Sequence, residues 1–189
     1  MSIRSITNFI YELAVLKKLP RSGSFIAGIK NPDTVAEHVF RATQVAFLLA
    51  ELEGGNGERA SFLVSLHDNA ETRIGDHHKI MSRYIPDKKD FEAEAFYDQI
   101  SGLPMPIQVK MQGAFEEFCA KKTTESICAH DADLLELAFE ANTMLQQGYA
   151  GMKDWLENIE KSLHTKSAQK IFEDMIHTSS NDWWKGLKK

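Results

Sequence analysis

The sequence has little of several features that mark whole classes of protein. It contains only two cysteines, Cys119 and Cys128, in 189 residues, so no disulfide framework is expected and a reducing cytoplasm suits the chain. It has no run of about 18 apolar residues, so no membrane span is expected. Tyr11 and Glu12 interrupt the apolar start of the chain and no small-residue cleavage site follows, which favours an amphipathic first helix over a signal peptide.

Positive charge is also scarce. The chain has 22 lysines and arginines against 27 aspartates and glutamates, a formal net charge of −5. This balance argues against a groove for a nucleic-acid polymer, which usually needs a basic surface. It does not exclude a small anionic substrate, because one local basic group or a bound cation can reverse the local field.

Strand patterns are scarce as well, because the valines and isoleucines fall mostly at helical spacing rather than in alternation. The length suits one domain with one core, and 43% hydrophobic and 26% charged residues are typical of a soluble globular protein. We therefore predict an all-α helical bundle with a core at about 20–145 and C-terminal helices at 151–178 packed on it. Thr34 and Glu37 predict a capping box at the start of one helix. The expected helices are 3–17, 34–52, 58–71, 77–84, 88–100, 105–121, 125–147, 151–163 and 167–178.

Polar side chains occupy apolar positions in the patterns of three of these helices. In 34–52, His38 lies on the edge of the apolar stripe. In 58–71, His67 stands where the pattern expects the next apolar residue, and Glu71 follows four residues later on the same side. Asp68 lies about 100° further round the helix than His67. In 125–147, Asp133 fills the position between two apolar residues of the stripe. Each of these helices therefore turns a metal-ligand type of residue toward the core.

Ionised groups in a core cost several kcal/mol each unless they are paired, and one bound cation would satisfy all of them. His38, His67, Asp68 and Asp133 form a mixed nitrogen and oxygen set, which suits one divalent transition metal (Mn, Co, Fe, Ni or Zn) better than calcium. Taken alone, His38 is more simply a core histidine with a hydrogen-bond partner, and an adjacent His-Asp pair is common by chance. The prediction of a metal site depends on the conjunction.

Three segments resemble the HD-domain metal-dependent phosphohydrolases, and most closely their 5′-deoxynucleotidase-like branch. They are NPDTVAEHVFRA at 31–42, LHDNAETRIGDHHK at 66–79 and DADLLELAFEA at 131–141, within a likeness that runs from about 20 to 145. The resemblance implies an all-helical fold, a homodimer and a small-molecule nucleotide substrate.

The resemblance also implies roles for single residues. It matches the four candidate ligands to the family's metal ligands. It matches Glu71 and Asp76 to acidic residues that take part in catalysis and nucleotide recognition. Arg21 matches an arginine that contacts the phosphate. The branch often has a tryptophan near that arginine, where this chain has RSGS at 21–24. Phe25 is the candidate replacement.

The reaction expected from these residues is release of phosphate from nucleoside (deoxy)monophosphates by attack of a metal-activated water. Glu71, one helical turn from His67, is the expected general base, with a surface carboxylate as the alternative. Arg21 would clamp the phosphate through a forked contact. Asp76 follows Gly75 at a predicted helix start, where a carboxylate can serve as an N-cap. The functional alternative is that Asp76 contacts the sugar hydroxyl or donates a proton to the leaving oxygen.

Other polar and aromatic residues have simpler expected roles. Arg73 either helps to neutralise the phosphate or is an exposed charge. The run His77, His78 and Lys79 is expected to be solvated rather than to meet substrate. Trp183 and Trp184 are expected to pack on the bundle or on a second subunit. Surface positions are expected for His164, His177, Lys121 and Lys122.

Three other functions stay open from the sequence. A phosphodiesterase acting on cyclic or other nucleotides would use two metals and extra histidines, whose spacing His77, His78 and His130 do not match. A non-catalytic metal- or nucleotide-binding module is the second alternative, although the ligand set and Glu71 are intact. A purely structural bundle is the third, and it predicts no bound transition metal.

Overall fold

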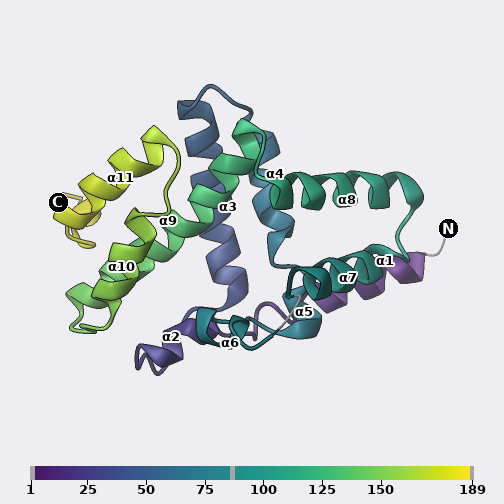
Figure 1. The fold of residues 1–189 in the computed structure, drawn as a ribbon, viewed down its shortest axis with the longest axis horizontal. Coiled ribbons are helices and arrows are strands. Elements are labelled where there is room, and N and C mark those ends of the chain that lie inside the picture. The colour runs from purple at the N-terminus through teal and green to yellow at the C-terminus, as the bar shows by residue number, and fades with distance from the viewer. Residues whose placement is uncertain (1–2, 86–87, 188–189) are drawn as a thin grey trace.

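The computed structural model describes residues 3–85 and 88–187, without the side chains of 88 and 89, and these residues form a bundle of helices (Figure 1). Within these two stretches the β-structure is limited to one isolated antiparallel bridge between Pro20 and Thr34. The predicted all-α fold is confirmed. None of the helices in the described part of the chain is both long and apolar enough to cross a bilayer.

The helices follow most of the predicted ranges. They are α1 (Ile3–Leu13), α2 (Ser22–Ile26), α3 (Val35–Leu52), α4 (Gly57–His67), α5 (Glu71–Ile74), α6 (Lys79–Ser82), α7 (Lys88–Ile100), α8 (Met105–Ala120), α9 (Thr124–Gln146), α10 (Met152–Glu160), α11 (Lys166–His177) and the 3₁₀ helix η1 (Asp182–Trp184). The short helix α2 was not predicted, because its five residues carry no periodic pattern.

The prediction of one helix over 58–71 is wrong. Helix α4 ends at His67 and α5 begins at Glu71. The side chain of Gln99 on α7 donates a hydrogen bond to the carbonyl of Asn69 in the break, over 3.3 Å. Asn69 and Gln99 are both buried, so a tertiary contact satisfies a backbone carbonyl at the point where the helix is interrupted.

The predicted capping box at the start of α3 is confirmed. The backbone N–H of Glu37 donates to the hydroxyl of Thr34 over 3.3 Å, and the N–H of Thr34 donates to the Glu37 carboxylate over 2.7 Å. Two of the donors that a helix start leaves without a partner are therefore satisfied.

Helices α3, α4 and α9 pack against one another and form the centre of the bundle (Figure 1). Leu49, Leu63 and Leu135, one from each helix, are fully buried. Helices α10 and α11 pack on α9 at the C-terminal side, and α8 packs on α4 at the opposite side. Side chains that project from α3, α4 and α9 are thus held by the most tightly packed part of the chain.

The aromatic C-terminus differs from one of its predicted arrangements. Trp183 is 76% exposed, so it does not pack on the bundle, whereas Trp184 donates from its indole nitrogen to Asn181 over 3.2 Å. The contact with a second subunit stays a prediction. His177 is exposed, as is most of the His164 side chain, so the surface positions predicted for both histidines are confirmed.

The carboxylate of Asp131 joins α9 to the start of α11. It is fully buried and accepts hydrogen bonds from the backbone N–H of Thr165 over 2.6 Å, from the Thr165 hydroxyl over 2.7 Å, and from the N–H of His164. We expect Asp131→Ala to lower the free energy of unfolding by about 3 kcal/mol or more, because it leaves these buried donors without an acceptor. Urea unfolding measures this loss. Asp174→Ala, at an exposed position of α11, is the control, and equal losses in the two variants would contradict the prediction.

Candidate active site

Three helices bring ligand-type side chains to one point. His38 from α3, His67 from the end of α4 and Asp133 from α9 each offer one ligand atom, and these atoms lie within 4.8 Å of one another. The Oδ1 atom of Asp133 is 3.1 Å from Nε2 of His38 and 3.8 Å from Nε2 of His67. Residues far apart in the sequence therefore form one cluster.

Asp68, the fourth predicted ligand, lies beside this cluster as the C-cap of α4. Its Oδ1 atom is 3.2 Å from Nε2 of His67, and its Oδ2 atom is 3.7 Å from Nε2 of His38. Oδ2 also accepts a hydrogen bond from Arg21 over 3.3 Å. Asp68 therefore connects the histidine cluster to the guanidinium of Arg21.

Both histidines turn the same ring nitrogen toward the cluster. The Nδ1 atom of His67 donates to the carbonyl of Val64 over 2.6 Å, and Nδ1 of His38 bonds to the carboxylate of Glu136. The Nε2 atoms are buried and make no hydrogen bond of acceptable geometry with the described part of the chain. A histidine whose Nδ1 atom bonds to a carbonyl or a carboxylate in this way typically binds a metal through Nε2. The donor set therefore fits a divalent cation.

The charges of the cluster are strongly coupled. Burial disfavours the charged form of His38, but the carboxylates of Asp133 and Glu136 outweigh it and raise the pKa of His38 to about 10. Burial raises the pKa of Asp133, but the two imidazoles hold it well below the usual range. A cation ligated by the same nitrogens would compete with these protons.

Arg21 lies between carboxylates at the entrance to the cluster. It precedes α2, and its Nη1 atom is 3.3 Å from Asp68 and 3.5 Å from Asp76. Burial opposes its charge, but Asp68, Asp76, Asp133 and Glu71 together raise the pKa of Arg21. The guanidinium is thus a fixed positive charge beside the cluster.

Asp76 holds the start of α2. Its carboxylate accepts from the backbone N–H of Ser22 as well as from Arg21. The N-cap interpretation of Asp76 is wrong, because α6 begins later and His78 is its N-cap. Asp76 follows Gly75, whose φ of 83° is in the region that favours glycine.

Glu71 is the first residue of α5 and is 8% exposed. The alternative that it is a surface carboxylate is therefore wrong, and so is the premise that it lies on the same helix as His67. Its negative charge contributes to the raised pKa of Arg21. Glu71 is thus a buried carboxylate on a separate short helix.

Arg73 takes no part in the site. It is ion-paired with Glu12 over 2.6 Å and with Asp98 over 2.5 Å. The suggestion that it neutralises a phosphate is not supported, because Arg73 does not line the cavity beside the cluster and instead pairs with carboxylates on α1 and α7.

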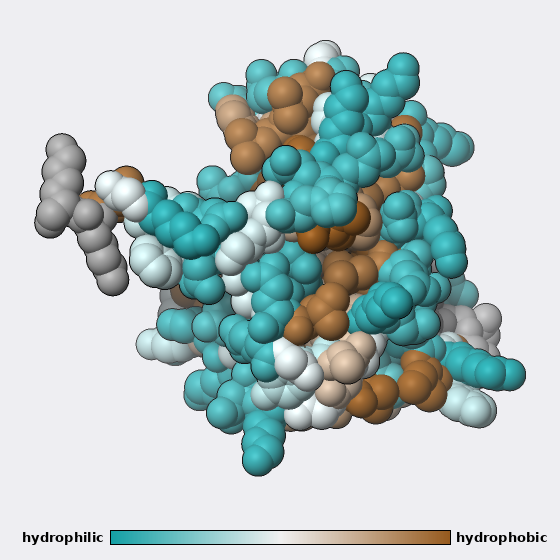
Figure 2. All heavy atoms as spheres, turned by 90° about the vertical axis from the view of Figure 1, so that its left-hand side faces the viewer, coloured by the Kyte–Doolittle hydropathy of each residue, from teal (hydrophilic) through white to brown (hydrophobic). Residues whose placement is uncertain are grey.

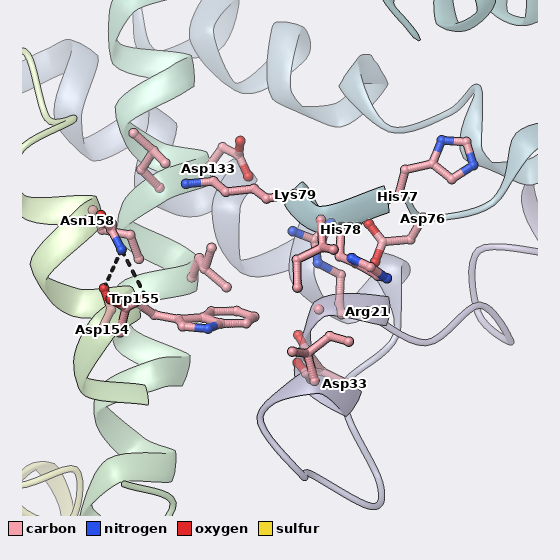
Figure 3. Close-up of a pocket in the computed structure, with 17 residues that line it drawn as sticks. Arg21, Asp33, Asp76, His77, His78, Lys79, Asp133, Asp154, Trp155 and Asn158 are labelled. Atoms are coloured by element: carbon pink, nitrogen blue, oxygen red, sulfur yellow. Dashed lines mark hydrogen bonds and ion pairs between the residues drawn. The ribbon is translucent and has the colours of Figure 1, made fainter. Parts of the chain in front are cut away.

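A cavity of about 440 Å³ adjoins the cluster (Figure 3). It lies between α2, α6, α9 and α10, and Asp133, Arg21 and Asp76 belong to both the cavity and the site. The residues that line it are Arg21, Gly23, Ser24, Ile26, Asp33, Asp76, His77, His78, Lys79, Ile80, Asp133, Leu134, Leu137, Asp154, Trp155, Asn158 and Ile159.

Two expectations change with this lining. The run from His77 to Lys79 forms part of the cavity wall rather than a freely solvated turn, although Lys79 is exposed. Phe25 does not line the cavity and is 50% exposed. The aromatic side chain in the wall is Trp155 of α10, which sequence reasoning missed because α10 lies outside the segments that carry the motifs.

Glu136 and Arg41 support His38 from behind. Glu136 is 2% exposed, bonds to Nδ1 of His38, and accepts from Nε of Arg41 over 2.8 Å. We expect Glu136→Gln to weaken metal binding by about 10- to 100-fold, because the outer carboxylate orients the ring and raises its basicity. Calorimetric titration with Mn²⁺ measures this change. Glu140→Gln, which removes only the other partner of Arg41, is the control, and an equal loss in both variants would contradict the prediction.

His130 contributes to stability near the site rather than to the ligand cluster. Its Nε2–H donates to the carbonyl of Phe118 over 2.8 Å, and its ring stacks on Phe118 at 3.9 Å. Burial lowers the pKa of His130 to about 4, although the bond to the carbonyl raises it.

This pKa predicts a loss of stability in acid. The imidazole binds a proton at about pH 6.5 in the unfolded chain but only near pH 4 in the folded one, so its contribution is present above pH 6.5 and is lost as the pH falls toward 4. Between pH 7 and 4.5 we expect the parent to lose about 2 kcal/mol more unfolding free energy than His130→Gln. Urea unfolding of both proteins at the two pH values tests this, and parallel losses would contradict it.

Comparison with known proteins gives consistent findings. A model of the HD-domain family matches residues 13–176. The 5'-deoxynucleotidase HDDC2 of Bos taurus is 26% identical over 139 residues, which are 74% of this chain and 67% of that protein. The 5'-deoxynucleotidase hdd1 of Schizosaccharomyces pombe is 29% identical over 140 residues, 70% of this chain and 69% of that protein. A conserved hypothetical protein from Pyrococcus furiosus has a similar structure, with a TM-score of 0.76, 28% identity, and coverage of 91% of this chain and 99% of that one.

Proposed function

We propose that this chain, which belongs to the HD-domain family, is a phosphohydrolase that releases phosphate from nucleoside 5′-monophosphates, deoxynucleotides included. The 5'-deoxynucleotidases among its relatives support this substrate class. We further propose that His38, His67, Asp68 and Asp133 hold one divalent transition-metal ion.

One observation carries the proposal. Ligand atoms of His38, His67 and Asp133 lie within 4.8 Å of one another, beside a cavity of about 440 Å³ that Arg21 also lines. A divalent cation held there would lower the pKa of a water molecule and polarise a phosphoryl oxygen. The cavity volume is within the range of small-molecule sites, about 300–1,000 Å³.

The residues around the cluster have distinct proposed roles. Arg21 binds the phosphate oxygens with its guanidinium, which two carboxylates already hold in place. Glu71 takes the proton from the attacking water, and that proton is then available to the leaving 5′ oxygen. Asp76 accepts hydrogen bonds from two donors, Arg21 and the N–H of Ser22. A carboxylate that accepts in this way is suited to position Arg21 and to contact a sugar hydroxyl. It is less suited to donate a proton to the leaving oxygen.

A substrate panel tests the proposal. Purified protein with added Mn²⁺ or Co²⁺ is expected to release phosphate from deoxy- and ribonucleoside 5′-monophosphates and to leave 3′,5′-cyclic nucleotides intact. Turnover of the cyclic diesters alone would overturn the monoesterase in favour of a phosphodiesterase. Metal and nucleotide binding without any turnover would favour a non-catalytic module.

A further inference from the structure

We propose that Trp155 forms the wall of the cavity on which the nucleobase stacks. This inference rests on the proposed function and names the part of the substrate that α10 recognises. It assigns a binding role to α10, which contributes none of the ligands or catalytic residues.

The indole lies close to the backbone of α2. A Cβ atom built on Gly23 would lie 2.8 Å from Cη2 and 3.4 Å from Cζ2 of Trp155. The absence of a side chain at Gly23 therefore lets the indole approach the backbone only two residues from Arg21. Figure 3 shows the indole extending from α10 across the cavity toward Arg21 and His78.

The lining of the cavity combines charged and apolar side chains. The charged ones are Arg21, Asp33, Asp76, Lys79, Asp133 and Asp154, and the apolar ones include Ile26, Leu134, Leu137 and Ile159. Figure 2 shows the face on which α2 and α10 lie, with apolar side chains gathered along its middle among hydrophilic ones. A mononucleotide also combines two kinds of group, because its phosphate is anionic and its base is a flat aromatic ring.

Trp155 is suited to stacking on the planar base of a mononucleotide. The described residues that line the cavity include no phenylalanine, no tyrosine and no other tryptophan. Trp155 is half-buried, so one part of the indole packs on the protein and the rest is accessible. Stacking on an aromatic ring tolerates any base, because every base has a π-face. The site should therefore require a base without selecting strongly among bases.

Comparing substrates with and without a base tests this inference. We expect Trp155→Ala to lower kcat/KM for deoxyadenosine 5′-monophosphate by about 10-fold or more, and to change kcat/KM for 2-deoxyribose 5-phosphate by less than about 2-fold, since that substrate has nothing to stack. Trp155→Phe keeps an aromatic ring, so it should lower kcat/KM for the nucleotide less than Trp155→Ala does. Retained turnover of the sugar phosphate shows that the variant is folded, and equal losses for both substrates, or no loss for the nucleotide, would overturn the inference.

A binding measurement separates this inference from the proposed function. The chain has three tryptophans, so Trp183→Phe with Trp184→Phe leaves Trp155 as the only indole. Deoxyadenosine 5′-monophosphate is expected to quench its fluorescence. Quenching without phosphate release from the parent would support the base wall and overturn the proposed hydrolase. Phosphate release without quenching, together with an unaffected Trp155→Ala variant, would overturn the base wall alone.

Discussion

Replacing His38 or Asp133 by alanine is expected to remove the bound metal and to reduce phosphate release by more than about 100-fold, since even an outer partner of a ligand is worth about 10- to 100-fold. The two side chains belong to different helices, α3 and α9, and contribute a nitrogen and an oxygen to the same cluster. The loss of either should therefore have the same consequence for metal content.

Elemental analysis of the purified variants, followed by calorimetric titration with Mn²⁺, measures this result. His177→Ala removes an exposed histidine of α11 and is expected to leave both metal content and activity unchanged. Thermal unfolding shows whether each variant is folded. A folded His38→Ala protein that retains one metal ion per chain would contradict the assignment of the cluster.

The cluster could be predicted because its residues break a pattern. His38, His67 and Asp133 each stand where an apolar residue is expected, and a polar side chain that faces a core needs a partner there. The structure places the three together. The carboxylate of Glu136 behind His38 was not predicted, because its contact joins residues 98 positions apart and leaves no periodic signal in either helix.

Tertiary contacts explain the parts that periodicity missed. The pattern over 58–71 continues across the break at 68–70, where the carbonyl of Asn69 accepts a hydrogen bond from Gln99 of another helix. Trp155 reaches the cavity because α10 packs on α9 and because Gly23 on α2 leaves space for its indole. Neither arrangement is encoded within one local window of sequence, whereas the start of α3 is, through Thr34 and Glu37.

The helix break matters for the residue proposed as the general base. If α4 continued, Glu71 would project one turn beyond His67 on the same face. Instead a separate helix, α5, begins at Glu71, whose carboxylate is buried and contributes to the raised pKa of Arg21. A buried carboxylate that interacts electrostatically with the group proposed to bind the phosphate is the candidate to receive a proton from water attacking phosphorus.

Glu71→Gln is therefore expected to reduce kcat by about 10²- to 10⁴-fold, the usual contribution of a general base, because the amide cannot accept the proton. Metal content should be unchanged, since Glu71 lies outside the ligand cluster, and this separates its role from those of His38 and Asp133. Single-turnover phosphate release and elemental analysis of the same preparation measure the two quantities. Glu58→Gln, at an exposed position in the first turn of α4, is the matched control. A Glu71→Gln protein with parental kcat would exclude Glu71 as the base, and one that had lost its metal would make Glu71 part of the metal site instead.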